Sequence, residues 1–253
     1  GPRLADSEMV VCVDPGHGGW DTGRQRQAGE YPQPWFDEAE INLAMAFMLR
    51  EELESRGVRV VMTRETGTAV NVFGEDVNGD GRTILDSAQD GDRDELQARI
   101  NICNASEADL LVSLHLNGFD DPAIRGYEVL YTPAPTRDFG NQNLDLATVI
   151  YRQIGAAYRE VGFETDPRGT VSDETLDAET HEFGSERNLV LTGPAVNNPD
   201  YTIVPSQMPG VFIEPVFISN QDDANFIVLP ENQRLLAASY AEGIMDYFDQ
   251  YPG

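Results

Sequence analysis

An unbroken apolar run, DLLVSLHL at residues 109–116, constrains the fold of this chain more than any other segment. A strand with water on one face alternates apolar and polar side chains, whereas a strand covered on both faces is apolar almost throughout. Residues 109–116 therefore predict a strand in the interior of a sheet that is covered on both sides.

The rest of the chain alternates between strand-like and helix-like patterns. Further strands are predicted at 9–13, 58–63, 127–131 and 210–214, and helices at 38–56, 94–106, 141–161 and 231–249. This alternation is typical of a single α/β domain, here residues 8–250. We expect a mixed, mostly parallel sheet with helices on both faces.

Two segments interrupt the alternation. Residues 71–93 are rich in Asp and Gly, and residues 164–208 are polar and contain several prolines. Long irregular segments of this kind usually lie on the surface of a domain. We therefore expect both to be surface insertions that contribute little to the core.

The charge of the chain excludes several classes of partner. The formal net charge is −27, and all 17 basic residues are arginine. The phosphates of nucleic acids would repel such a surface, so no nucleic acid partner is expected. Anionic membranes and anionic wall polymers would repel it as well. Because no run of about 18 apolar residues occurs, membrane insertion is not expected either.

The two cysteines, Cys12 and Cys103, have neither metal-site spacing nor the pattern of a disulfide framework. Cys12 lies in a predicted strand and Cys103 in a predicted helix. Both are interpreted as small buried apolar side chains. A disulfide between them stays open as an alternative.

Two of the three histidines follow predicted strands. His17 comes shortly after the strand at 9–13, within DPGHGG, and His115 lies near the end of the apolar run 109–116. Sites in α/β proteins assemble at strand ends. One such histidine would most simply bond to the backbone, but two together favour metal ligands. His181, in the second insertion, is interpreted as a surface histidine.

Two carboxylates add to this pattern. Glu38 begins the first predicted helix and is a candidate third ligand, although the helix dipole favours glutamate there in any case. Glu214 ends the apolar strand GVFIE, where a carboxylate is costly to bury without a role. It is the candidate general base. Asp14 and Asn117 could orient the metal ligands through hydrogen bonds.

Four segments carry these positions, and together they resemble one family, the zinc-dependent N-acetylmuramoyl-L-alanine amidases of the amidase 3 type. The segments are VVCVDPGHGGWDTG, EAEINLAMAFMLREELESRGVRVVMTRET, LQARINICNASEADLLVSLHLNG and MPGVFIEPVFISN. They occur in the order of the family and extend over nearly the whole chain. The resemblance implies zinc-dependent hydrolysis of the amide bond between N-acetylmuramic acid and L-alanine in bacterial peptidoglycan.

The resemblance also implies a role for each candidate residue. His17, Glu38 and His115 fall on the family's zinc ligands, and Glu214 falls on its catalytic glutamate. Two imidazoles and one carboxylate would leave zinc an open fourth position, as in catalytic sites. A zinc peptidase acting on the stem peptide and a catalytically silent wall-binding module are the alternatives.

The family context also suggests a location and partners. We expect a secreted or wall-associated protein, although the first residues do not read as an export signal. Because an anionic wall would repel the acidic surface, we expect a wall-binding module or an activator protein to act with this domain.

The sequence departs from the family pattern near Glu214. Pro215 and Val216 follow it where the family usually has a small glycine, which could reshape the floor of the site. The preceding TIVPSQMPG lacks the arginine that the family often carries. Arg168 or Arg187, both in the second insertion, could replace it.

The first insertion contains a calcium-like motif, DVNGDGRTILD at residues 76–86. Asp76, Asn78, Asp80 and the following glycine match positions 1, 3, 5 and 6 of an EF-hand-like loop. Position 12 is a serine, but Asp86 lies beside it. We expect calcium to rigidify this loop. An acidic, solvated turn is the alternative.

Overall fold

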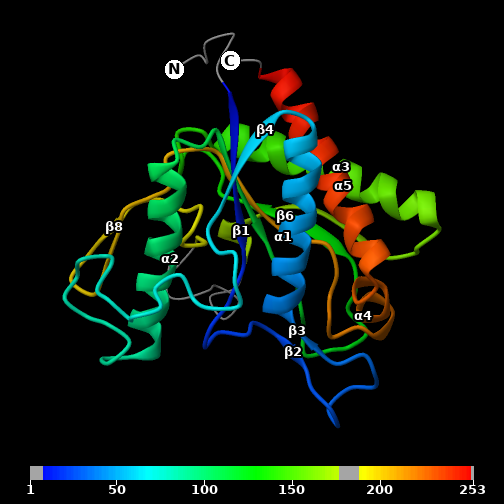
Figure 1. Cartoon of the computed structure of the whole chain (residues 1–253), viewed down its shortest axis with the longest axis horizontal. Helices are drawn as coiled ribbons and strands as arrows, with labels where there is room; N and C mark the ends of the chain where they lie inside the picture. The colour runs from blue at the N-terminus through cyan, green and yellow to red at the C-terminus, as the bar shows by residue number, and fades with distance from the viewer. Residues whose placement is uncertain (1–7, 177–187, 252–253) are drawn as a thin grey trace.

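Six strands form the central sheet of the computed structural model, which describes residues 8–176 and 188–251 (Figure 1). The strands are β1 Met9–Pro15, β4 Val58–Met62, β5 Leu110–Leu114, β6 Tyr127–Tyr131, β7 Pro167–Ser172 and β10 Gly210–Glu214. Their order is β4-β1-β5-β10-β6-β7, and only the β10–β6 pair is antiparallel. The prediction of a mixed, mostly parallel sheet is confirmed, with β5 in its interior.

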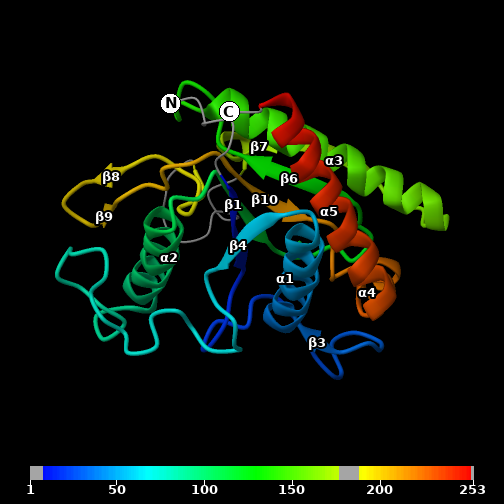
Figure 2. The ribbon, with the colours of Figure 1, turned by 45° about the horizontal axis from the view of Figure 1, so that its top comes forward.

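Helices cover both faces of the sheet, as predicted. They are α1 Glu38–Ser55, α2 Ala88–Ala105, α3 Gly140–Val161, α4 Gln221–Ile227 and α5 Pro230–Gln250. Figure 2 shows α1, α3 and α5 together on one face and α2 on the other. None of the helices in the described ranges is both long and apolar enough to cross a membrane.

The alternation of side chains along β1 explains the two cores. Val11 and Val13 face the larger core under α1, α3 and α5. Val10 and Cys12 face a smaller core, which Ile100 of α2 helps to fill. Because both faces are buried, residues 9–13 of β1 are all apolar, and β5 is apolar except for Ser113.

The remaining short elements lie in loops around the sheet. They are β2 Gln25–Arg26, β3 Phe36–Asp37, β8 Val196–Asn197, β9 Thr202–Ile203 and the 3₁₀ turn Asp173–Thr175. β2 pairs with β3 and β8 with β9, each antiparallel.

Helix α2 begins six residues earlier than predicted. Its N-cap is Ser87, whose hydroxyl accepts the backbone N–H of Asp90 at 3.1 Å. Such a cap satisfies one of the unpaired donors of the first turn. Residues 88–93, assigned to the first insertion from the sequence, are therefore the start of the helix.

The expectation that residues 164–208 contribute little to the core is wrong. β7 joins the main sheet as its edge strand, and Leu191, Ile203 and Met208 are buried in the smaller core. An edge strand pairs on one side only and tolerates proline at its first position, here Pro167. A mostly polar segment can therefore still be part of the sheet.

The structure also corrects the interpretation of the two cysteines. Cys12 of β1 and Cys103 of α2 form a disulfide, with their Cα atoms 5.5 Å apart. Both are fully buried in the smaller core, so their burial was predicted and their pairing was not. The bond joins a strand and a helix separated by 91 positions in the sequence.

Loss of this disulfide should lower the stability of the protein. Closing a long loop restricts the unfolded chain, so Cys12→Ala with Cys103→Ala should lower the free energy of unfolding by about 2 to 4 kcal/mol. Denaturant unfolding of the double variant, beside the wild type with and without reductant, measures the change. A wild type whose midpoint is insensitive to reductant would contradict the prediction.

Candidate metal centre

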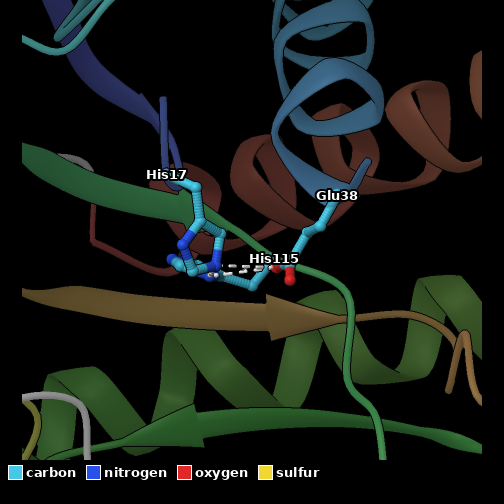
Figure 3. A group of neighbouring side chains, drawn as sticks. All are labelled: His17, Glu38 and His115. Carbon is cyan, nitrogen blue, oxygen red and sulfur yellow. Dashed lines mark hydrogen bonds and ion pairs between the residues drawn. The ribbon is translucent and has the colours of Figure 1, made fainter. Parts of the chain in front are cut away.

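The parallel strands bring the candidate residues to one edge of the sheet. β1, β5 and β10 run in the same direction, so their carboxyl ends lie together. His17 follows β1, His115 follows β5, and Glu214 is the last residue of β10. Glu38 reaches the same edge from the first turn of α1, the blue helix in Figure 3.

Three of these side chains converge. Figure 3 shows His17, Glu38 and His115 pointing toward one another from three different elements. Glu38 Oε1 lies 3.1 Å from His17 Nε2 and 3.3 Å from His115 Nδ1, and the two imidazole nitrogens are 3.2 Å apart. In the described part of the chain this is the one group of three or more His, Cys, Asp or Glu ligand atoms that converges so closely. The donor set suits a zinc-like metal.

Two glycines allow the imidazoles to approach the backbone. A Cβ atom at Gly16 would clash with the ring of His115, and one at Gly23 would lie 2.6 Å from His17 Cδ2. His17 itself has a φ of 61°, in the left-handed region that non-glycine residues rarely adopt. Gly16 and Gly23 therefore permit close packing around the cluster.

Glu38 is held as an ionised carboxylate. Burial alone would raise its pKa, but the adjacent His17 and His115 hold the pKa well below the usual 4.5. The backbone N–H groups of Leu116 and Arg24 donate to its two oxygens at 2.8 and 2.9 Å. An ionised carboxylate fixed in this way is what a metal ligand requires.

Asp21 supports His17 and was missed by the sequence reasoning. His17 Nδ1 donates to Asp21 Oδ2 at 2.7 Å, which leaves Nε2 to face the cluster. Burial raises the pKa of Asp21, but the hydrogen bond and charge of His17 outweigh it and lower the pKa. Carboxylates commonly orient metal-binding histidines in this way. The only signal in the sequence is the acid four residues after His17.

Asp14 supports the same loop indirectly. It is buried, it receives hydrogen bonds from Ser113 and Thr63, and its Oδ1 lies 2.9 Å from a guanidinium nitrogen of Arg99. Arg99 in turn donates to the backbone oxygen of His17 at 2.6 Å. Asp14 therefore acts on the cluster through Arg99 and the backbone.

Glu214 lies beside a second carboxylate that the sequence reasoning missed. Glu128 of β6 pairs with Glu214 in the sheet register. The side-chain amide of Asn117 donates to both carboxylates, at 2.7 Å to Glu128 Oε1. Arg168 Nε donates to the other oxygen of Glu128 at 2.8 Å, and its guanidinium lies over the ring of Phe217. Glu128 resembled an ordinary strand residue in the sequence.

One cavity of about 570 Å³ joins these groups. It is lined by the three converging side chains and by Asn117, Glu128, Arg168 and Glu214. Pro215 and Val216 are buried and are not among its described lining residues. A cluster of metal-ligand type, a carboxylate and an arginine around one cavity are the groups that metal-assisted hydrolysis uses. Arg187 and His181 lie outside the described residues.

The calcium-like loop lies apart from this cavity. Residues 76–86 precede α2, and none of Asp76, Asn78, Asp80 or Asp86 is among the described lining residues. Asp86 accepts the backbone N–H of Thr83 at 2.9 Å.

Comparison with known proteins identifies one family. The family model described as N-acetylmuramoyl-L-alanine amidase matches residues 11–246. The germination-specific N-acetylmuramoyl-L-alanine amidase of Bacillus subtilis (strain 168) is 26% identical over 247 residues, which cover 96% of this chain and 81% of that protein. AmiA of Escherichia coli (strain K12) is 21% identical, with 97% of this chain and 78% of that protein covered.

Solved structures share the fold. The CwlD amidase of Clostridioides difficile, solved in complex with the GerS lipoprotein, is 23% identical with a TM-score of 0.66, and the match covers 96% of this chain and all of that chain. The catalytic domain of CwlV from Bacillus (Paenibacillus) polymyxa var. colistinus is 22% identical with a TM-score of 0.60, covering 95% and 98%.

Replacing Asp14 should destabilise the protein. In Asp14→Asn the buried Arg99 loses a charged partner, so we expect the free energy of unfolding at pH 7 to fall by about 3 kcal/mol. Ser113→Ala, which removes one hydrogen bond to Asp14, should cost only about 1 kcal/mol. Denaturant unfolding compares the two variants, and similar losses would contradict the role of the ion pair.

The pH dependence of this effect has a definite sign. Burial raises the pKa of Asp14, but Arg99, Thr63 and Ser113 outweigh it and lower the pKa below 3.8. The stability that Asp14 contributes is therefore complete above pH 3.8 and is lost as the pH falls through its folded pKa. The difference between wild type and Asp14→Asn should close only in that acidic range.

Proposed function

The chain belongs to the N-acetylmuramoyl-L-alanine amidase family, and we propose that it cleaves its substrate with a zinc ion held by His17, Glu38 and His115. The reaction of the family is hydrolysis of the amide bond between N-acetylmuramic acid and L-alanine in peptidoglycan. The observation that carries the zinc proposal is the convergence of two imidazole nitrogens and one ionised carboxylate at the wall of a single cavity.

The donor set fits zinc and leaves the cavity side of the cluster to the reactants. When bound, zinc polarises a carbonyl group and lowers the pKa of a coordinated water molecule toward about 7. The residues around the ligands hold them in position. Asp21 holds the ring of His17, and the N–H groups of Leu116 and Arg24 hold Glu38.

Glu214 is proposed as the general base and acid. It lines the same cavity as the ligands, and the amide of Asn117 holds its carboxylate. In this position it can take a proton from the attacking water and deliver it to the departing amine nitrogen of L-alanine. The amide bond then breaks, leaving the lactyl carboxylate on the glycan and a free amino group on the peptide.

Arg168 is proposed to position the substrate. Its side chain is 39% exposed and lines the cavity, so it can donate hydrogen bonds to substrate oxygens. Glu128 holds one edge of the guanidinium, which leaves the remaining N–H donors for the substrate. Arg168 is thus a substitute for the arginine that the segment before Glu214 lacks.

We propose that the protein works outside the cytoplasm, secreted or associated with the wall. The buried disulfide supports this location, because disulfides persist in oxidising compartments. The net charge of −27 opposes approach to an anionic wall, which supports a role for a wall-binding module or an activator protein. The similar CwlD amidase has a lipoprotein partner in its solved structure.

Glu214→Gln tests the catalytic proposal. The amide cannot accept the proton of water, so kcat should fall by about 10² to 10⁴-fold while the zinc content stays at one per chain. The measurement is the release of L-alanine amino termini from purified peptidoglycan, with zinc quantified by atomic absorption. His115→Ala, the matched variant, should lose zinc as well as activity.

The products distinguish the alternatives. Release of amino termini from residues other than L-alanine would indicate a peptidase acting on the stem peptide. A wild type that binds sacculi but releases no termini, with Glu214→Gln binding equally well, would indicate a wall-binding module. Either result would overturn the proposed reaction.

Glu128→Gln tests the positioning of Arg168. With the charge of Glu128 removed, Arg168 is held less firmly, so KM should rise by about tenfold with a smaller change in kcat. Steady-state kinetics on soluble peptidoglycan fragments separate the two constants. Glu160→Gln, on the exposed surface of α3, is the control and should leave both unchanged. A fall in kcat alone would contradict the positioning role.

A further inference from the structure

The loop before α2 is folded around its own acidic side chains. Asp76 accepts the backbone N–H groups of Gly79 and Gly81, at 2.8 and 2.9 Å, through its two oxygens. Asp80 accepts the N–H of Arg82 at 2.9 Å. These bonds give the loop a defined shape, but they do not by themselves indicate a ligand.

A buried carboxylate from outside the loop, that of Asp94, also contacts it. Asp94, in the second turn of α2, is only 1% exposed. Its Oδ1 accepts the backbone N–H groups of Val77 and Asn78, at 2.8 and 3.1 Å, so this side chain is docked on the loop. Its Oδ2 is buried and has no hydrogen-bond donor anywhere in the described part of the chain. A buried charged oxygen without a partner is costly.

The neighbouring charges increase this cost. Burial raises the pKa of Asp94, and the negative charges of Asp76 and Asp80 raise it further, against the N–H donors that lower it. The charges of Asp76 and Asp80 therefore act on Asp94, although the three carboxylates do not converge as closely as the ligand atoms of the histidine cluster. Within residues 8–176 and 188–251, no arginine forms an ion pair with any of the three.

We propose that Asp76, Asp80 and Asp94 bind a calcium ion, with Asp94 supplying the carboxylate that the sequence lacks at position 12 of the loop. The amide nitrogen of Asn78 donates to Asp80 Oδ2 at 3.1 Å, and its side-chain oxygen, which accepts the backbone N–H of Asp80 at 3.0 Å, is the neutral ligand of the proposed site. Asp86 is not proposed as a ligand, because its hydrogen bond closes a separate turn at Thr83, beyond the residues that Asp94 contacts. All the proposed ligand atoms are oxygens, most of them from carboxylates, which suits calcium better than zinc or magnesium.

The site would connect the insertion to the helix that supports the metal centre. One residue beyond Asp94, Glu95 accepts the backbone N–H groups of Val70 and Asn71, at 2.9 and 2.6 Å. One turn further, Arg99 binds the backbone of His17. A cation at Asp94 thus fixes the first turns of α2, on which the position of Arg99 depends.

Calcium binding can be measured on the zinc-loaded protein. The protein is passed over a chelating resin, reloaded with one equivalent of zinc and titrated with calcium chloride by calorimetry. We expect one saturable site, with Tm rising by about 3 to 6 °C when free calcium is tenfold above the dissociation constant. The absence of both heat and Tm shift would overturn the proposal. An equal shift with magnesium chloride would overturn the assignment to calcium.

Two matched variants test the ligands. Asp94→Asn keeps an oxygen for the N–H groups of Val77 and Asn78 but removes the charge. It should weaken calcium binding at least tenfold, while its Tm without calcium should equal or exceed that of the wild type. Asp86→Asn should bind calcium within twofold of the wild type. Retention of binding in Asp94→Asn, or its loss in Asp86→Asn, would overturn the assignment.

A loop variant covers the case in which Asp94→Asn fails to fold. Asp80→Asn changes a residue of the loop and leaves α2 intact, and it should also weaken calcium binding at least tenfold. Normal binding by Asp80→Asn would overturn the site. These measurements do not depend on peptidoglycan hydrolysis, so they remain informative even if the proposed zinc chemistry fails.

Discussion

The buried guanidinium of Arg99 is the interaction on which the metal cluster depends most. It is 2% exposed, and it binds Asp14 in β1, Glu95 in its own helix and the backbone of Pro15 and His17. Burial lowers the pKa of Arg99, but the two carboxylates outweigh it and raise the pKa. The charge therefore persists in the interior. Because one planar group contacts a strand, a helix and a loop, it fixes the position from which His17 reaches the cluster.

The direction of the strands explains the rest of the site. Parallel strands β1, β5 and β10 bring His17, His115 and Glu214 to one edge, as expected for α/β sheets. The antiparallel strand β6 begins at that edge and so places Glu128 beside Glu214. The change of direction within the sheet thus adds a second carboxylate that an all-parallel sheet would not place there.

Much of the fold and of the cluster could be predicted because the signals are local. The apolar run of β5 and the histidines after two strands are readable from short segments, and the resemblance to the amidases is confirmed by the family match. Other features depend on three-dimensional proximity. Two cysteines 91 positions apart do not reveal a Cα separation of 5.5 Å. Asp94 looks like any acid near a helix start, and β7 is too polar to be recognised as a strand.

The disulfide has a consequence for how the cluster recovers from fluctuations. Cys12 lies two residues before Asp14, and Cys103 lies one helical turn after Arg99, so the covalent bond and the ion pair tether the same strand to the same helix. When thermal motion separates Asp14 from Arg99, the crosslink keeps the two charges at a high local concentration. Asp14 and Arg99 should then form their ion pair again before β1 and α2 separate further. Excursions of the His17 loop should therefore remain small and reversible, rather than spreading into the sheet.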